Sequence, residues 1–93
     1  MTAGVVYSRR AAAEIEEITT FLAEHSQPAA TRFTEAIGRA EQQLAEYPNS
    51  DAAGLSPRTR RLIVGDYIVS YRRRESDVEI FAARHARRRD ARL

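Results

Sequence analysis

Apolar residues recur along the first half of the chain with spacings that predict one strand followed by two helices. The run Val5-Val6-Tyr7 predicts a short strand, and Ser8 is a candidate N-cap for the helix after it. From residue 9 to 24 apolar side chains return every three or four positions, which predicts an amphipathic helix. A second helix is expected to begin at Pro28, capped by Ser26 or Gln27, and to end at Tyr47-Pro48.

The two predicted helices each carry one apolar stripe, and the short link between them predicts an antiparallel hairpin. The stripes are Ala11, Ile15, Ile18 and Leu22 in the first helix, and Ala30, Phe33, Ile37, Ala40 and Leu44 in the second. The aromatic residues Phe21, Phe33, Tyr67, Tyr71 and Phe81 are expected in the core or at its rim.

The last third of the chain changes to an alternating pattern, which predicts three strands after a polar loop at residues 49–57. The strands cover 59–64, 67–73 and 78–84, with tight turns at Gly65-Asp66 and at 75–77. The last strand is apolar on both faces at its centre, so it should lie inside the sheet. The order β-α-α-β-β-β predicts one α+β domain over residues 1–93, with the helical hairpin packed against a small, mainly antiparallel, curved sheet.

Charge is distributed unevenly along the chain, although the formal net charge is only +2. Residues 1–57 carry a net charge of −4 and residues 58–93 a net charge of +6, and all 15 basic residues are arginine. The segment 86–93 is a basic tail. The chain has no cysteine, no signal-peptide pattern and no apolar run of the roughly 18 residues that a membrane span needs. We therefore expect a cytoplasmic protein.

The chemistry-bearing residues offer little for metal or serine catalysis. His25 and His85 are the only histidines, no close-spaced carboxylate joins either, and no metal or cofactor is expected. The serines lack a nucleophile elbow, and the four glycines are scattered singly, so no phosphate-binding loop is expected.

The strongest candidate site is a basic band around the predicted sheet. Its members are Arg60, Arg61, Arg72, Arg84, His85, Arg87 and Arg88. The band could bind phosphate or an acidic protein surface. It could also form a metal-independent ribonuclease, in which His85 would be the acid or base and arginines would stabilise the developing phosphate charge. A third interpretation is a solvated rim of arginines whose stems cover apolar sheet edges.

A motif in the last third also carries a resemblance to a known family. It is R-x-L-x-V-G-x-Y-x-x-x-Y, beginning at Arg60 and ending at Tyr71, followed by the apolar strand V-x-I from Val78 and by H-x-R-R from His85. With the strand-then-serine opening and the helix ending in LAEYP, the chain resembles the RelE/ParE superfamily of type II toxin–antitoxin toxins over nearly its full length. The resemblance implies the same β-α-α-β-β-β fold.

The position of Ile68 favours one branch of this superfamily. In RelE-like toxins, which cut messenger RNA on the ribosome, the matching segment is approximately G-Y-R-L-V-Y, and its arginine belongs to the active site. Ile68 stands in place of that arginine. The resemblance therefore implies a ParE-like toxin that inhibits DNA gyrase by binding, with no catalytic residue.

The resemblance also implies a partner and leaves two alternatives open. The partner is a ParD-like antitoxin, through which alone the toxin would contact promoter DNA. One alternative is a RelE-like endoribonuclease with His85, Arg84 and Arg60 in its active site. The other is an inactive family member that is retained for its antitoxin complex or for binding its own promoter.

Overall fold

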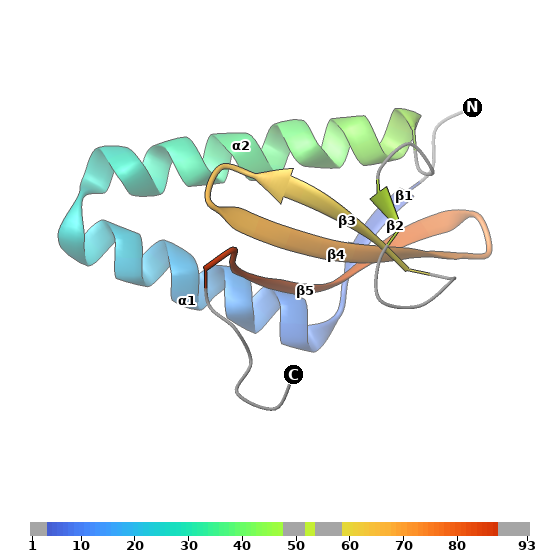
Figure 1. Ribbon diagram of the computed structural model, residues 1–93, viewed down its shortest axis with the longest axis horizontal. Helices are drawn as coiled ribbons and strands as arrows, with labels where there is room; N and C mark the ends of the chain where they lie inside the picture. The colour runs from blue at the N-terminus through green and yellow to red at the C-terminus, as the bar shows by residue number, and fades with distance from the viewer. Residues whose placement is uncertain (1–3, 48–51, 54–58, 88–93) are drawn as a thin grey trace.

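The computed structural model describes residues 4–47, 52–53 and 59–87, which form a helical hairpin lying against one face of a sheet (Figure 1). The elements are β1 (Gly4–Tyr7), α1 (Arg9–His25), α2 (Gln27–Glu46), β2 (Ala52–Ala53), β3 (Thr59–Val64), β4 (Tyr67–Arg74) and β5 (Asp77–His85). The predicted order β-α-α-β-β-β is confirmed. The two-residue strand β2 was not predicted, because the loop in which it lies has no alternating pattern.

The five strands form a single sheet in the order β1-β5-β4-β3-β2. β1 runs parallel to β5, while the β2–β3, β3–β4 and β4–β5 pairs are antiparallel. The prediction that the last strand is interior is confirmed, since β5 lies between β1 and β4. The predicted tail at 86–93 lies outside the described residues after Arg87.

Serine side chains define where both helices begin. Ser8 Oγ accepts a hydrogen bond from the backbone N–H of Ala11 at 3.0 Å, as expected for an N-cap. Ser26 Oγ accepts from the N–H of Ala29, so Ser26 caps α2 and Pro28 occupies its first turn. The backbone N–H of Ser26 also donates to Leu22 O, which ends α1. One residue therefore closes one helix and opens the next.

The core lies between the hairpin and the inner face of the sheet. All five residues of the predicted α2 stripe are buried. Four of them, all except Ala30, form one cluster with the sheet residues Leu62, Val64, Val69, Tyr71, Val78, Ile80 and Ala83. In α1 only Ala11 is fully buried, while Ile15, Ile18 and Leu22 pack against the core's edge. No helix in the described part of the chain is long and apolar enough to cross a membrane.

The prediction that Phe21 belongs to the core or its rim is wrong. Its side chain is 55% exposed, and its ring packs against His25 with centroids 4.3 Å apart. Phe21 precedes Leu22 of the apolar stripe by one residue, and one residue turns a helix by about 100°. This rotation directs Phe21 out of the helix–sheet interface.

Candidate functional site

Strand alternation distributes the predicted basic band over both faces of the sheet. Arg61, Arg72 and Arg84 lie on the open face, which is turned away from the helices. Arg60 shares the inner side with Leu62, and the ring of His85 contacts Tyr67 on that side. Arg87 follows β5, and Arg88 lies outside the described residues. The sheet therefore brings three of the seven predicted residues together on one surface.

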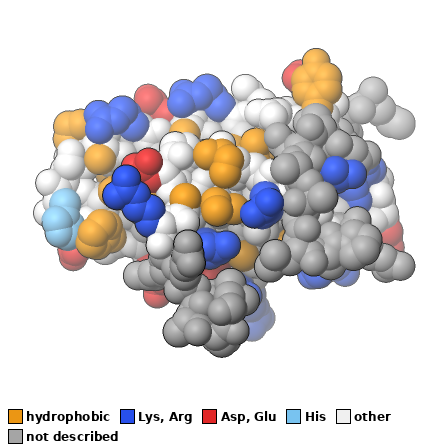
Figure 2. All heavy atoms as spheres, in the orientation of Figure 1, with side chains coloured by type: hydrophobic (Ala, Val, Ile, Leu, Met, Phe, Trp, Pro, Cys, Tyr) orange, Lys and Arg blue, Asp and Glu red, His pale blue; other side chains and the backbone are white. Residues whose placement is uncertain are grey.

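The centre of the open face is apolar. Ile63 and Ile68 are direct cross-strand partners, and Ile63 is 66% exposed. A β-bulge between Ser70 and Tyr71 shifts the β4–β5 register, and Phe81 lies beneath Arg72, whose guanidinium carbon is 5.1 Å from the ring centroid. Figure 2 shows hydrophobic side chains in the middle of this face with arginines around them. We call Ile63, Ile68, Phe81, Arg61, Arg72 and Arg84 the open-face patch.

A buried carboxylate organises one side of the open-face patch. Glu79 is only 8% exposed, and its two oxygens accept from Arg72 Nε at 2.9 Å and from Arg74 Nη1 at 3.5 Å. This pairing keeps Arg72 above the ring of Phe81 and offsets part of its charge. The side of the patch near Glu79 is therefore less attractive to phosphate than the number of arginines alone suggests.

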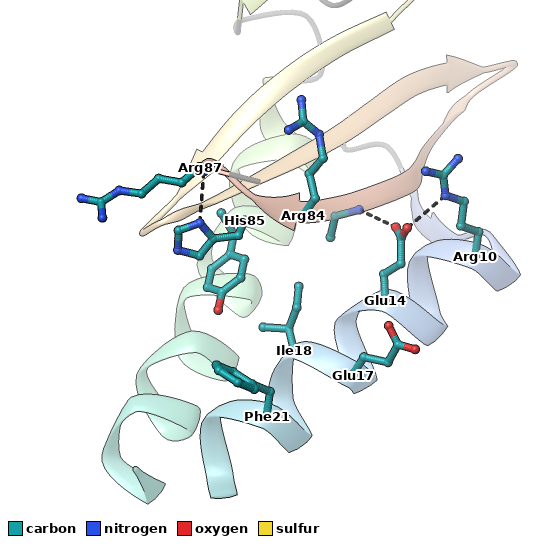
Figure 3. Close-up of a pocket in the computed structure, with 10 residues that line it drawn as sticks. Arg10, Glu14, Glu17, Ile18, Phe21, Arg84, His85 and Arg87 are labelled. Atoms are coloured by element: carbon teal, nitrogen blue, oxygen red, sulfur yellow. Dashed lines mark hydrogen bonds and ion pairs between the residues drawn. The ribbon is translucent and has the colours of Figure 1, made fainter. Parts of the chain in front are cut away.

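A second surface lies between α1 and the end of β5, where a groove of about 570 Å³ opens (Figure 3). Its α1 wall is formed by Arg10, Glu14, Glu17, Ile18 and Phe21, and its sheet wall by Tyr67, Ala83, Arg84, His85 and Arg87. Glu14 crosses between the walls, because its Oε1 accepts from Ala83 N–H at 2.8 Å and its Oε2 accepts from Arg10 Nε at 3.0 Å. We call this the α1–β5 groove.

His85 is fixed by its neighbours in this groove. Its ring meets that of Tyr67 edge-on, with centroids 5.2 Å apart, and its Nδ1 accepts from the backbone N–H of Arg87 at 3.0 Å. Tyr67 in turn contacts the ring of Phe33. Burial, together with the charge of Asp66, raises the pKa of Tyr67. The hydroxyl of Tyr67 is therefore protonated near neutral pH.

The three residues of the nuclease hypothesis do not converge. Arg84 and His85 are consecutive in β5 and point to opposite faces. Arg60 lies four residues from Val64, which is in the same row of the sheet as His85. At about 3.3 Å per residue, this separates Arg60 from that row by roughly 13 Å along the strand. No group of three or more potential metal ligands occurs among the described residues.

Sequence reasoning missed the α1 wall of the groove. Arg10, Glu14, Glu17 and Phe21 follow one another at spacings of four, three and four, which places them on one side of the helix. This second stripe was visible in the sequence. The groove that this stripe forms with β5 could not be seen in the sequence, because Glu14 and its partner Ala83 are 69 residues apart.

Comparison with known proteins identifies the class and then the family. The fold matches a solved structure described as the chromosomal ParDE TA system from P. aeruginosa, with a TM-score of 0.75 and 18% identity over 89% of this chain and 95% of that one. In sequence, the chain is 38% identical over 82 residues to "Putative toxin Y4kP" of Sinorhizobium fredii (strain NBRC 101917 / NGR234). This match covers 86% of the chain and 84% of that protein.

The family assignment follows from a match over nearly the whole chain. The model of the ParE toxin of the type II toxin-antitoxin system, parDE, matches residues 5–90. The chain therefore belongs to the ParE toxin family. The resemblance inferred from the motif at 60–71 is confirmed, including its ParE branch.

Proposed function

We propose that this ParE-family toxin inhibits bacterial DNA gyrase by binding it in the cytoplasm, and that a ParD-like antitoxin holds it inactive. Family membership supports the toxin role. The observation that carries the choice of mechanism is the apolar centre of the open-face patch, where Ile63 and Ile68 lie side by side across β3 and β4.

An apolar centre suits protein binding better than RNA cleavage. Cleavage of a phosphodiester needs cations or hydrogen-bond donors directed at the phosphate, and an isoleucine pair supplies neither. Protein interfaces, in contrast, combine a central apolar and aromatic cluster with arginines. Ile63, Phe81 and Arg72 have this combination.

The same surface accounts for neutralisation by an antitoxin. The open face carries Arg61, Arg72 and Arg84, so an acidic polypeptide would be attracted to it. The solved structure with the matching fold is described as a ParDE system, which names the class of partner proposed here. An antitoxin that covers this face would exclude the target directly.

The first test is a gyrase supercoiling assay with the purified chain, beside pulse-labelling of DNA and protein synthesis in cells that express it alone. Inhibited supercoiling and an early fall in DNA synthesis, while translation continues, are expected. We expect Arg72→Glu to weaken inhibition about tenfold or more, because it reverses a charge beside the apolar centre of the patch. Arg32→Glu, on an exposed part of α2, should leave inhibition unchanged.

The competing mechanism predicts a different pattern. If the chain cuts messenger RNA on the ribosome, protein synthesis would stop first and His85→Ala would abolish toxicity. A binding toxin should tolerate His85→Ala better than removal of residues 87–93. Messages cut at codons, together with uninhibited gyrase, would overturn the proposal.

A further inference from the structure

Glu79 is the only charged side chain that is buried in the described part of the chain. It lies in β5 between two direct partners, Val6 of β1 and Arg72 of β4. Removing a carboxylate from water is costly, and a buried ion pair often stabilises a fold no more than apolar residues of similar size would. The core cluster includes the neighbours Val78 and Ile80, on the other face of β5, but not Glu79. Its carboxylate therefore belongs to the open face, where Arg72 lies.

Two contacts fix the guanidinium of Arg72 on this face. Its Nε donates to Glu79 Oε1 at 2.9 Å, and its central carbon is 5.1 Å from the centroid of the Phe81 ring. The β-bulge contributes to the second contact, because Phe81 is the β5 residue that it leaves without a direct partner on β4. Bulges redirect side chains in this way. Arg72 is thus held along one edge by a carboxylate and on one face by a ring.

The rest of the Arg72 guanidinium is available to a binding partner. The side chain is 45% exposed, and its Nη1 and Nη2 bond to no other residue in the part of the chain that the structure describes. These two groups form a planar fork that matches a carboxylate. An exposed arginine loses rotamer freedom when it binds, and this loss costs affinity. Arg72 has already lost part of that freedom, so a protein carboxylate would meet an ordered pair of donors.

We infer that Glu79 determines the specificity of the open-face patch, because it positions Arg72 for a carboxylate of the protein target and lowers the affinity of the patch for nucleic acid. The part that concerns the target rests on the proposed function, and the part that concerns nucleic acid does not. Glu79 is nearly inaccessible and acts through Arg72, so it is a positioning residue.

The charge of Glu79 affects the two kinds of ligand differently. Affinity for nucleic acid follows the number of cations that neutralise phosphates. Glu79 reduces that number, because it is paired with Arg72 and, at 3.5 Å, with Arg74. Affinity for a protein depends instead on ordered apolar, aromatic and arginine side chains at the centre of the interface. Glu79 supports this order, since it keeps Arg72 over Phe81.

Glu79→Gln tests the inference, because the amide keeps the shape of the side chain and removes its charge. Anisotropy of a short fluorescein-labelled DNA duplex measures nucleic-acid binding at several salt concentrations, and supercoiling inhibition is measured on the same preparation. DNA affinity should rise about fivefold, with a salt slope steeper by about 0.9. Inhibition should fall about fivefold, because Arg72 is less ordered. Glu35→Gln, the same charge change on an exposed part of α2, should alter both by less than about twofold.

Two further measurements separate the position of Arg72 from the charge of Glu79. Glu79→Asp keeps the charge but shortens the reach, so inhibition should fall about fivefold while DNA affinity stays within about twofold of wild type. NMR relaxation of the Arg72 Nε–H should show a restricted side chain in the wild type and a mobile one in both Glu79 variants. In an Arg72→Ala background, Glu79→Gln should no longer weaken inhibition, because the effect passes through Arg72.

Several results would overturn the inference. These are DNA affinity and inhibition that fall together, an Arg72 Nε–H equally mobile in wild type and Glu79→Gln, or an undiminished effect in the Arg72→Ala background. Inhibition that follows the melting temperatures of the variants, and not the mobility of Arg72, would make Glu79 a structural residue. Wild-type toxin that leaves gyrase active, with DNA binding and Arg72 mobility as expected, would refute the proposed function alone. Gyrase inhibition that Glu79→Gln leaves unchanged, with unchanged DNA affinity, would refute only the role of Glu79.

Discussion

Tyr7 connects the first strand to the second helix through a side-chain hydrogen bond. Its hydroxyl donates to Glu41 Oε2, 34 residues away. Burial of the ring is the main reason why the pKa of Tyr7 lies well above its ordinary value of 10.0, and the adjacent Glu41 carboxylate raises it further. The folded protein therefore retains this proton more strongly than the unfolded chain does.

This difference in proton binding gives stability a defined pH dependence. Because the folded-state pKa of Tyr7 is raised, its contribution is complete below about pH 10 and is lost as pH rises above that value. We expect Tyr7→Phe to lower the free energy of unfolding by about 1.5 kcal/mol at pH 7. Denaturant unfolding at several pH values measures both effects. Tyr7→Phe has no hydroxyl proton at this position, so its stability should fall less than that of the wild type as the pH rises above 10. An equal fall in both proteins would show that Tyr7 is not the group responsible.

The helical hairpin depends on one residue at its turn. Ser26 N–H donates to Leu22 O at 2.6 Å, and Ser26 Oγ accepts from Ala29 N–H at 3.3 Å. We expect Ser26→Ala to lower the free energy of unfolding by about 1 kcal/mol, because it removes the cap of α2. Ser26→Gly should cost only a few tenths of a kcal/mol. Equal losses in thermal or denaturant unfolding would show that the hydroxyl is not the stabilising group.

At the scale of elements, local patterns predicted most of the fold. The α2 stripe, the Ser8 cap and the turn at Gly65-Asp66 all depend on neighbours within a few residues, and all are present. Gly65 has φ +60, a conformation that glycine adopts readily, which explains why the turn could be recognised from the sequence. β2 is only two residues long and is defined by its pairing with Arg60 and Arg61, so its own sequence carries no alternating pattern from which it could be predicted.

The candidate site was predicted less completely than the fold, for the same reason. Alternation along each strand correctly separated Arg60 from Arg61 and Arg72 from Tyr71. It could not show that α1 would leave a groove beside β5, because that depends on how the hairpin packs on the sheet. The contributions of Glu14 and Phe21 were missed accordingly.

Viewed as a whole, the molecule exposes an apolar side chain at the centre of the surface where gyrase binding is proposed. Ile63 is 66% exposed, so Ile63→Ser should change the free energy of unfolding by less than about 1 kcal/mol. It should weaken gyrase inhibition about tenfold, since truncation of a central interface residue costs at least that much when the residue is a binding hot spot. Gln42→Ser, on the exposed side of α2, is the matched control.

The two measurements on Ile63→Ser have distinct meanings. Melting temperature reports stability, and the supercoiling assay reports target binding. Inhibition that is unchanged in a protein of unchanged melting temperature would remove Ile63 from the target surface. A large fall in melting temperature for Ile63→Ser but not for Gln42→Ser would instead show that Ile63 supports the fold.

The parallel pair of β1 and β5 also determines when the toxin can form during translation. Val5 pairs with Val78, so a strand near the start of the chain needs one near its end. Because β5 is also the partner of β4, the strand that joins β1 to the rest of the sheet is missing until translation has passed His85. A nascent chain emerges from its N-terminal end and folds only as its partners appear. Ribosome-bound fragments that end before β5 should therefore be harmless to the cell that makes them.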